Sequence, residues 1–173
     1  DIEYPEYVEA QRNDEYMLGS YIVVAPIDEA VTNQKVDNSA LTHLEDGKET
    51  AGLAAEYYAN KDGSGTPVRR QTNIFFDWGT GGPAGLGTDN FSVKWSGNIT
   101  IGKNPAALSF FADDAVIVWL DGEKVIDGSD VYDCYLSTKV LAANTKHTLE
   151  VYYAEYQYNA HIYMYYMEQP AAG

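Results

Sequence analysis

The sequence predicts an all-β fold, an antiparallel β-sandwich or barrel, preceded by an extension that contains one apolar strand. Three observations support this prediction. Short apolar runs alternate with turn residues over residues 52–167, and none has the length of an ordinary helix. Tyrosine, which suits half-buried strands, occurs 15 times. The hydrophobic fraction of 45% is sufficient for a packed core, which excludes a disordered chain.

The expected strands follow one another at short intervals. The clearest is the stretch 91–96, in which apolar and polar residues alternate. An Asp121-Gly122 turn separates two further strands and indicates a hairpin. The other expected strands are 53–58, 74–78, 106–111, 115–120, 124–126, 136–141, 148–154 and 162–166.

The first 50 residues differ in pattern from the rest. A polar entry leads to a run from Tyr21 to Ile27 that is apolar on both faces, as a buried parallel strand is. Residues 28–50 are polar and predict a linker or a loosely packed strand-turn segment. The expected organisation is an extension, a linker, a β domain and a tail within a piece of a longer protein. The bounds are 1–27, 28–50, 51–168 and 169–173.

The charge balance is strongly acidic. Lys and Arg total 11 against 26 Asp and Glu, a formal net charge of −15, which argues against nucleic acid and anionic membranes as partners. This charge is compatible with cation binding, although solubility alone explains most such charges. A single cysteine, Cys134, excludes an intrachain disulfide and leaves the compartment open. No apolar run approaches the length of a membrane span.

Asp113 and Asp114 stand side by side between two apolar strands. In an extended trans backbone neighbouring side chains point to opposite faces, so the two carboxylates converge only if the backbone is unusual, as at a non-proline cis peptide. A hard cation such as Ca²⁺, which takes about 6–8 oxygen ligands, would then hold both. The alternative from the pair alone is a surface turn with two solvated acids. We expect a cis or strained peptide near a pocket.

Several other candidate motifs lack the spacing or the neighbouring elements that their chemistry requires. The glycine-rich loop 79–87 lacks a Gly-Lys-Ser/Thr ending and leads into a strand, so it is no phosphate site. The spacing of Asp127, Asp130 and Asp133 is not that of an EF-hand loop. The order of residues supports no Ser/His/Asp set. Zinc-type spacing is absent from the three histidines, which are His43, His147 and His161.

Five motifs in order give residues 52–167 a resemblance to the PA14 domain, which is found in bacterial glycosidases and yeast adhesins. They include a Gly-Leu-Ala-Ala-Glu-Tyr-Tyr start and a Phe-Ser-Val-Lys-Trp-Ser-Gly strand. The region also contains the two central strands around the aspartate pair. The motifs are residues 52–58, 76–78, 91–97, 111–122 and 147–153.

This resemblance implies a sugar site. In the adhesin members the matching aspartate pair is joined by a cis peptide and holds Ca²⁺, which coordinates sugar hydroxyls. The resemblance therefore assigns Asp113 and Asp114 as metal and sugar ligands, with Asn159 as the third metal-binding side chain. The residues expected to stack on the sugar ring are Tyr156, Tyr158 and Trp119, although a core position is the competing interpretation for Trp119.

A second resemblance covers the first 27 residues. The segments 4–7 and 15–27 are similar to the end of the catalytic barrel in glycoside hydrolase family thirty-one, which contains α-glucosidases and α-xylosidases. The two catalytic aspartates of that family lie upstream of this segment and are not in this chain. The resemblance implies a PA14 domain inserted after the barrel of a larger α-glycosidase, whose catalytic domain would be its partner.

The motifs and the two resemblances leave two functional hypotheses. The first is a carbohydrate-binding accessory domain that uses Ca²⁺, and the alternative is a non-binding insert that shapes the active-site entrance of the parent enzyme. Catalysis by the chain itself is disfavoured, because retaining glycosidases need carboxylates about 5–5.5 Å apart on a rigid cleft. Separated from a barrel, the run from Tyr21 to Ile27 is expected to pair with a sandwich edge or with a second copy, which would give a non-physiological dimer.

Overall fold

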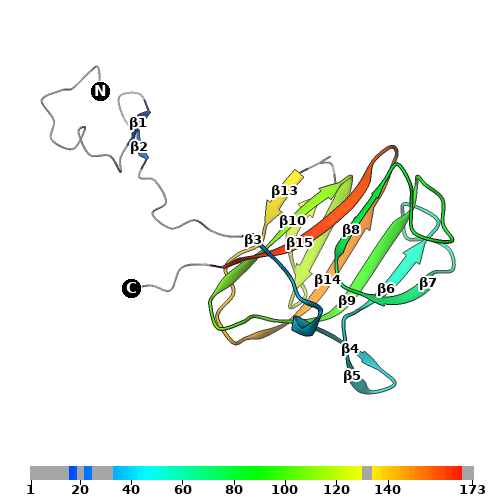
Figure 1. Cartoon of the computed structure of the whole chain (residues 1–173), viewed down its shortest axis with the longest axis horizontal. Helices are drawn as coiled ribbons and strands as arrows, with labels where there is room; N and C mark the ends of the chain where they lie inside the picture. The colour runs from blue at the N-terminus through cyan, green and yellow to red at the C-terminus, as the bar shows by residue number, and fades with distance from the viewer. Residues whose placement is uncertain (1–15, 19–21, 25–32, 130–133, 169–173) are drawn as a thin grey trace, which may run out of the picture. The chain divides into compact units, whose positions relative to one another are not determined.

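The computed structural model describes residues 16–18, 22–24, 33–129 and 134–168. The chain divides into two units, Asp1–Ala30 and Val31–Gly173. Figure 1 shows the second unit as two β-sheets packed face to face. Among its described residues the only helix is a short 3-10 turn, η2 (Asn38–Ala40), and no described helix could cross a membrane. The predicted all-β antiparallel sandwich is confirmed.

Within the described residues the larger sheet has eight strands in the order β12-β11-β14-β9-β4-β5, and β6 pairs with β7 and β9. All strand pairs among its described residues are antiparallel. Its strands are β4 (Leu41–Glu45), β5 (Lys48–Ala51), β6 (Leu53–Tyr58), β7 (Val68–Thr72), β9 (Ser92–Thr100), β11 (Ala115–Leu120), β12 (Glu123–Gly128) and β14 (Lys146–Ala154).

The smaller sheet has five described strands in the order β13-β10-β15-β3, with β8 also pairing with β15. These pairs are antiparallel as well. Its strands are β3 (Asn33–Lys35), β8 (Phe75–Gly79), β10 (Ala106–Asp113), β13 (Cys134–Ser137) and β15 (Ala160–Glu168).

The core lies between the two sheets and follows the alternation of the strands. On β14, Leu149, Val151 and Tyr153 are buried, whereas the residues between them are more exposed. Trp95 on β9 is 1% exposed, and its indole Nε1 donates a hydrogen bond to Thr72 Oγ1 at 2.9 Å. A buried indole N–H needs such a partner, so Trp95 is a satisfied core residue.

The segment 28–50, expected as a linker or a loosely packed strand-turn segment, contains strands from residue 33 onward. There the chain supplies β3, which pairs with β15, and β4, which pairs with β9. Val36 and Leu41 are 2% and 0% exposed within the core. The physical reason is that backbone pairing itself needs few apolar residues, so two buried side chains are enough to fix a segment whose composition is polar.

The apolar run near the N-terminus pairs locally. Its described part, β2 (Ile22–Val24), is antiparallel to β1 (Tyr16–Leu18) in a two-stranded sheet. One edge of this strand thus pairs with a hairpin partner, and its expected pairing with an edge of the sandwich stays a prediction. Tyr21 and residues 25–27 lie outside the described residues. The dimer and the barrel-end origin of this segment stay predictions.

The strand register brings several connections to one end of the sandwich. Ala115 on β11 pairs with Ala154 on β14, and Ala154 pairs with Ser92 on β9. Ser92 in turn pairs with Tyr58, the last residue of β6. These pairs align the start of β11, the end of β14 and the end of β6, so the turns that follow or precede them meet at that end.

Candidate functional site

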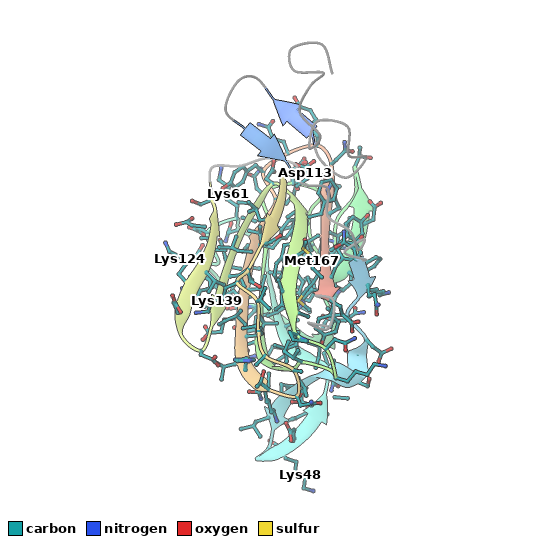
Figure 2. All side chains as sticks on the ribbon, turned by 90° about the vertical axis from the view of Figure 1, so that its left-hand side faces the viewer. Lys48, Lys61, Asp113, Lys124, Lys139 and Met167 are labelled. Carbon is teal, nitrogen blue, oxygen red and sulfur yellow. The ribbon has the colours of Figure 1, made fainter. Side chains whose placement is uncertain are left out.

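A pocket of about 770 Å³ opens among these connections. Its lining comes from the turn after β6, the β10–β11 junction and the β14–β15 loop. Figure 2 shows Lys61 and Asp113 at the same end of the sandwich, opposite Lys48 on the β4–β5 hairpin. The described lining residues are Lys61, Asp113, Asp114, Tyr156, Gln157, Tyr158 and Asn159.

The peptide bond between Asp113 and Asp114 is cis, and both residues line the pocket. The expectation of such a peptide beside a pocket is confirmed. Asp114 is 3% exposed, and its Oδ2 accepts a hydrogen bond from the backbone N–H of Tyr156 at 2.6 Å. The carbonyl oxygen of Asp113 accepts a hydrogen bond from the Tyr153 hydroxyl. Strand β14 and the loop after it therefore fix the pair from one side.

The β14–β15 loop presents its side chains to the same pocket. The Tyr158 ring is 75% exposed, and its backbone N–H donates to Asp89 Oδ1 at 3.1 Å. The Tyr156 hydroxyl donates to the carbonyl of Ser129 at 3.2 Å, which anchors that ring. Asn159 is exposed at the end of the loop. The structure thus brings together five of the six residues expected at the site.

Trp119 is the expected site residue that the structure places elsewhere. It is not among the lining residues of the pocket. Core residues Val118 and Leu120 flank it on β11, so the indole lies on the outer face of the sheet, where it pairs with the exposed Glu150. It follows Asp114 by five residues of strand, a separation of about 16 Å at roughly 3.3 Å per residue.

Glu155 is a site residue that sequence reasoning missed. It is 0% exposed, its Oε1 has no hydrogen-bond partner among the described residues, and its Oε2 lies 3.2 Å from the Tyr153 hydroxyl. Burial, with the negative charges of Asp114, Asp113 and Asp89, raises the pKa of Glu155 to about 8. The sequence offered one indication of this burial. Glu155 follows the buried Leu149, Val151 and Tyr153 at the same spacing of two residues.

The Tyr153 hydroxyl connects Glu155 to the aspartate pair. The Tyr153 hydroxyl has one proton and lies within hydrogen-bond distance of two acceptors, the Asp113 carbonyl and Glu155 Oε2. The Tyr153 hydroxyl is the donor in both contacts, so one hydroxyl links Glu155 to the backbone of the aspartate pair.

The donor set around the pair suits a hard cation. No group of three or more His, Cys, Asp or Glu side chains in the described part of the chain is arranged to hold a metal ion. The pocket instead offers two carboxylates and the Asn159 amide, whose oxygens are of the kind that Ca²⁺ takes.

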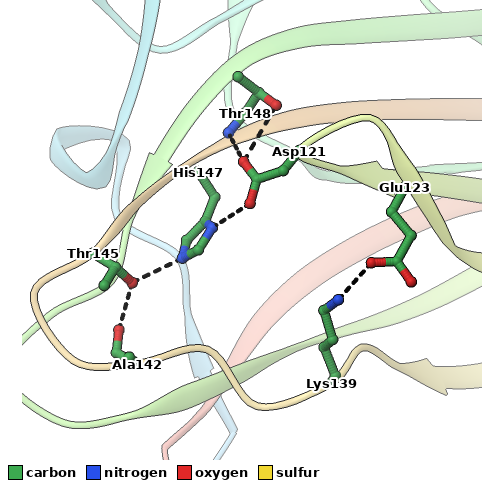
Figure 3. Close-up of polar contacts among 7 residues, drawn as sticks. All are labelled: Asp121, Glu123, Lys139, Ala142, Thr145, His147 and Thr148. Carbon is green, nitrogen blue, oxygen red and sulfur yellow. Dashed lines mark hydrogen bonds and ion pairs between the residues drawn. The ribbon is translucent and has the colours of Figure 1, made fainter.

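A second polar cluster lies at the β11–β12 hairpin (Figure 3). Asp121 Oδ2 is 2.6 Å from His147 Nδ1, and His147 Nε2 is 2.8 Å from Thr145 Oγ1. The sequence of contacts from Asp121 through His147 to Thr145 resembles a catalytic triad. The Thr145 hydroxyl, however, donates its proton to the carbonyl of Ala142 at 2.6 Å, so His147 does not activate it as a nucleophile. Asp121 Oδ1 accepts the backbone N–H of Thr148 at 2.9 Å, so the cluster ties two turns together.

The comparisons with known proteins agree with this fold. The model of the PA14 domain family matches residues 49–171. A search of curated proteins finds no match. Among solved structures, an anti-sigma factor domain-containing protein is 28% identical with a TM-score of 0.64, over 70% of this chain and 44% of its own.

Two further solved structures have the same fold at lower identity. An anti-sigma factor domain-containing protein from Clostridium clariflavum is 22% identical over 70% of this chain and 43% of its own, with a TM-score of 0.60. A GH31 alpha-xylosidase from Xanthomonas citri is 18% identical over 82% of this chain and 16% of its own, with a TM-score of 0.59. The chain spans less than half the length of each.

Proposed function

This chain belongs to the PA14 domain family, and from that premise we propose that it is a carbohydrate-binding accessory domain of a larger protein. The site is the pocket around Asp113 and Asp114. One observation carries the proposal, which is that two adjacent carboxylates line a single pocket together with the exposed ring of Tyr158. Carboxylates that share a pocket with an exposed aromatic ring can contact the hydroxyls of a sugar and one face of its ring.

Calcium is the cation that we propose for this site. The side chains that would hold it are those of Asp113, Asp114 and Asn159, and when bound it supplies positive charge and coordination positions for sugar hydroxyls. The Asp114 carboxylate is already oriented, because its Oδ2 accepts a hydrogen bond from the Tyr156 N–H. Burial of Asp114 makes a cation more favourable here than at an exposed aspartate.

The sugar ring itself would lie against Tyr158. Its ring is the exposed aromatic surface of the pocket, whereas the Tyr156 ring is anchored by its hydroxyl. Gln157 and Asn159 supply amide groups beside it, which can donate to or accept from hydroxyls. The pocket thus combines one apolar face with several polar groups, as carbohydrate sites do.

The parent protein that we propose is an α-glycosidase, with its catalytic domain as the partner of this chain. The support is the resemblance of the segments 4–7 and 15–27 to the end of a family thirty-one barrel. The chain itself would then be non-catalytic, since the catalytic aspartates of that family lie upstream of the matching segment. The anti-sigma factor domain-containing proteins show that the same fold also occurs beside other kinds of domain.

Glycan-array binding, with and without a calcium chelator, tests the proposal. We expect wild type to bind a defined set of glycans in calcium and to lose them in the chelator. Asp113→Asn and Asp114→Asn should lose the same glycans in calcium. The matched control is Asp127→Asn, an aspartate that pairs with Lys124 at 2.5 Å outside the pocket, and it should bind as wild type does. Absence of calcium-dependent binding would favour an insert that only shapes the entrance of the parent enzyme.

A further inference from the structure

Lys61 is a basic side chain in a pocket built around two aspartates. Among the described residues that line the pocket it is the one that carries positive charge. It forms no ion pair with any described residue, although Asp113 and Asp114 line the same cavity. Figure 2 shows it at the same end of the sandwich as Asp113. A lysine that lines the same cavity as two carboxylates without an ion pair to them is available to a ligand.

The turn that carries Lys61 is tied to the sheet. The carbonyl of Lys61 accepts a hydrogen bond from the Tyr152 hydroxyl, and the carbonyl of Asn60 accepts one from Ser92 Oγ at 2.7 Å. The ammonium group lies 4.9 Å from the centroid of the Tyr156 ring. Tyr156 is the residue whose N–H binds Asp114, so the ammonium group and the aspartate pair are positioned by one loop.

The charge balance of the pocket points to an acidic ligand. A divalent cation on Asp113 and Asp114 would compensate their two charges, and Lys61 would then remain as an uncompensated positive charge. A neutral sugar gives that ammonium group only hydroxyl acceptors, whereas a carboxylate gives it a charge-assisted hydrogen bond, which is roughly twice as strong. We propose that the sugar taken by this pocket carries a carboxylate, as a uronic acid does, and that Lys61 distinguishes it from the neutral sugar.

This inference rests on the proposed function of the same pocket. It concerns one carboxylate and not a long polyanion, because the chain carries a net charge of −15 that repels extended acidic polymers. Lys61 is exposed, so its contribution should weaken as salt is added. The ligand class is therefore a short oligosaccharide or a chain end with one uronic acid at the metal.

The test is an NMR titration of the full chain at saturating calcium with two matched pairs of sugars. The pairs are methyl β-D-glucuronide with methyl β-D-glucoside, and methyl α-D-galacturonide with methyl α-D-galactoside, each differing at the C6 carboxylate. We expect wild type to prefer one of the uronides by about fivefold, the range of an exposed charged contact. Lys61→Met should remove the preference and keep the weaker neutral binding, while Lys61→Arg should retain it.

The control variant is Lys48→Met, which removes a lysine at the opposite end of the sandwich and should behave as wild type. Equal binding of acid and neutral sugar by wild type, or an unchanged preference in Lys61→Met, would overturn the role of Lys61 and leave the sugar site standing. Tighter calcium binding by Lys61→Met without a change in sugar preference would show that Lys61 only offsets the aspartates. If Asp113→Asn binds the sugars as wild type does, the proposed function itself fails.

Discussion

Glu155 is the carboxyl group whose protonation the pocket alters most. Burial and three neighbouring aspartates raise its pKa to about 8, well above the ordinary value near 4.3. The folded state therefore binds a proton that the unfolded state releases between these two pH values. The stability that this proton contributes is fully present below about pH 4.3 and is lost as pH rises towards about 8.

The first prediction concerns this pH dependence in the presence of a chelator. The free energy of unfolding of wild type should fall between about pH 4.5 and about pH 8, because folding then requires uptake of a proton at Glu155. Glu155→Gln keeps the shape and the hydrogen bonds without the charge, so its curve should be flatter over this window. Urea unfolding at several pH values measures both. Glu150→Gln, an exposed residue on the same strand, is the control, and equal slopes for all three proteins would contradict the assignment.

The second prediction compares two of the three aromatic residues expected at the site, Tyr158 and Trp119. Tyr158→Ala should weaken sugar binding by about fivefold, since an exposed ring that stacks on a ligand contributes roughly 1 kcal/mol. Trp119→Ala should leave sugar affinity unchanged, because Trp119 lies on the outer face of the larger sheet. Titration of each variant with the sugar found on the array measures this. A larger loss for Trp119→Ala than for Tyr158→Ala would refute this placement.

The β11–β12 hairpin depends on a turn that two neighbouring elements hold in place. Asp121 and Gly122 have φ angles of 53° and 79°, as both central residues of a type I′ turn do. The Asp121 carboxylate accepts hydrogen bonds from His147 and from the N–H of Thr148, which lower its pKa in that order of importance. Its contribution to stability is present above its ordinary pKa of about 3.9 and is lost as pH falls through the lower folded value.

The third prediction uses Asp121→Asn, since asparagine also tolerates a positive φ. The variant should lose about 1 kcal/mol of stability near pH 7, the magnitude of one net hydrogen bond, and this difference from wild type should shrink below about pH 4. Asp46→Asn is the matched control, because Asp46 occupies the corresponding turn of the β4–β5 hairpin with a φ of 50°. Chemical denaturation compares them, and similar losses in the two variants would argue against a specific role for His147.

The strands of the sandwich show which elements a sequence reveals. The central strands β9, β11 and β14 were predictable because buried and exposed residues alternate along them. Strands β3, β4 and β5 were not, because their residues are mostly exposed and only Leu41 and His43 of β4 are buried. Such a strand is fixed by backbone pairing with its neighbour, which leaves little trace in hydropathy.

Part of the candidate site was also predictable from the sequence. The Asp113-Asp114 pair stands out in the sequence, and the resemblance to the adhesin members of the PA14 family placed Asn159 beside it. Lys61 could not be found, because it reaches the pocket only through the pairing of β6 with β9, across 52 residues from Asp113. Glu155 was overlooked because a charged residue at a strand end is usually exposed.

At the scale of the whole molecule, the sandwich begins before the region that resembles PA14. The fourth prediction is that a chain starting at Val31 keeps the stability of the sandwich, whereas one starting at Ala51 loses β3, β4 and β5. Removing the buried Leu41 alone should cost about 2–5 kcal/mol, with the loss of Val36 in addition. Denaturation of the two truncated chains tests this, and equal stability would show that residues 31–50 are dispensable.

The same truncated chains test the predicted dimer. Light scattering of the full chain and of the chain from Val31 should give a dimer and a monomer if the run from Tyr21 to Ile27 pairs between copies. Identical monomeric masses would exclude that association. Either result leaves the sandwich and its pocket unchanged, because Asp1–Ala30 and Val31–Gly173 are separate units.

Thermal unfolding of wild type in calcium and in chelator is the most direct test of the central claim, a cation held by the aspartate pair. A ligand at about one hundred times its Kd stabilises the folded state by about 2.7 kcal/mol, which for a domain of this size is a rise in Tm of roughly 5–10 °C. Wild type and Asp127→Asn should show this rise, and Asp114→Ala and Asp113→Ala should not. Identical melting temperatures of wild type in saturating calcium and in chelator would contradict the account.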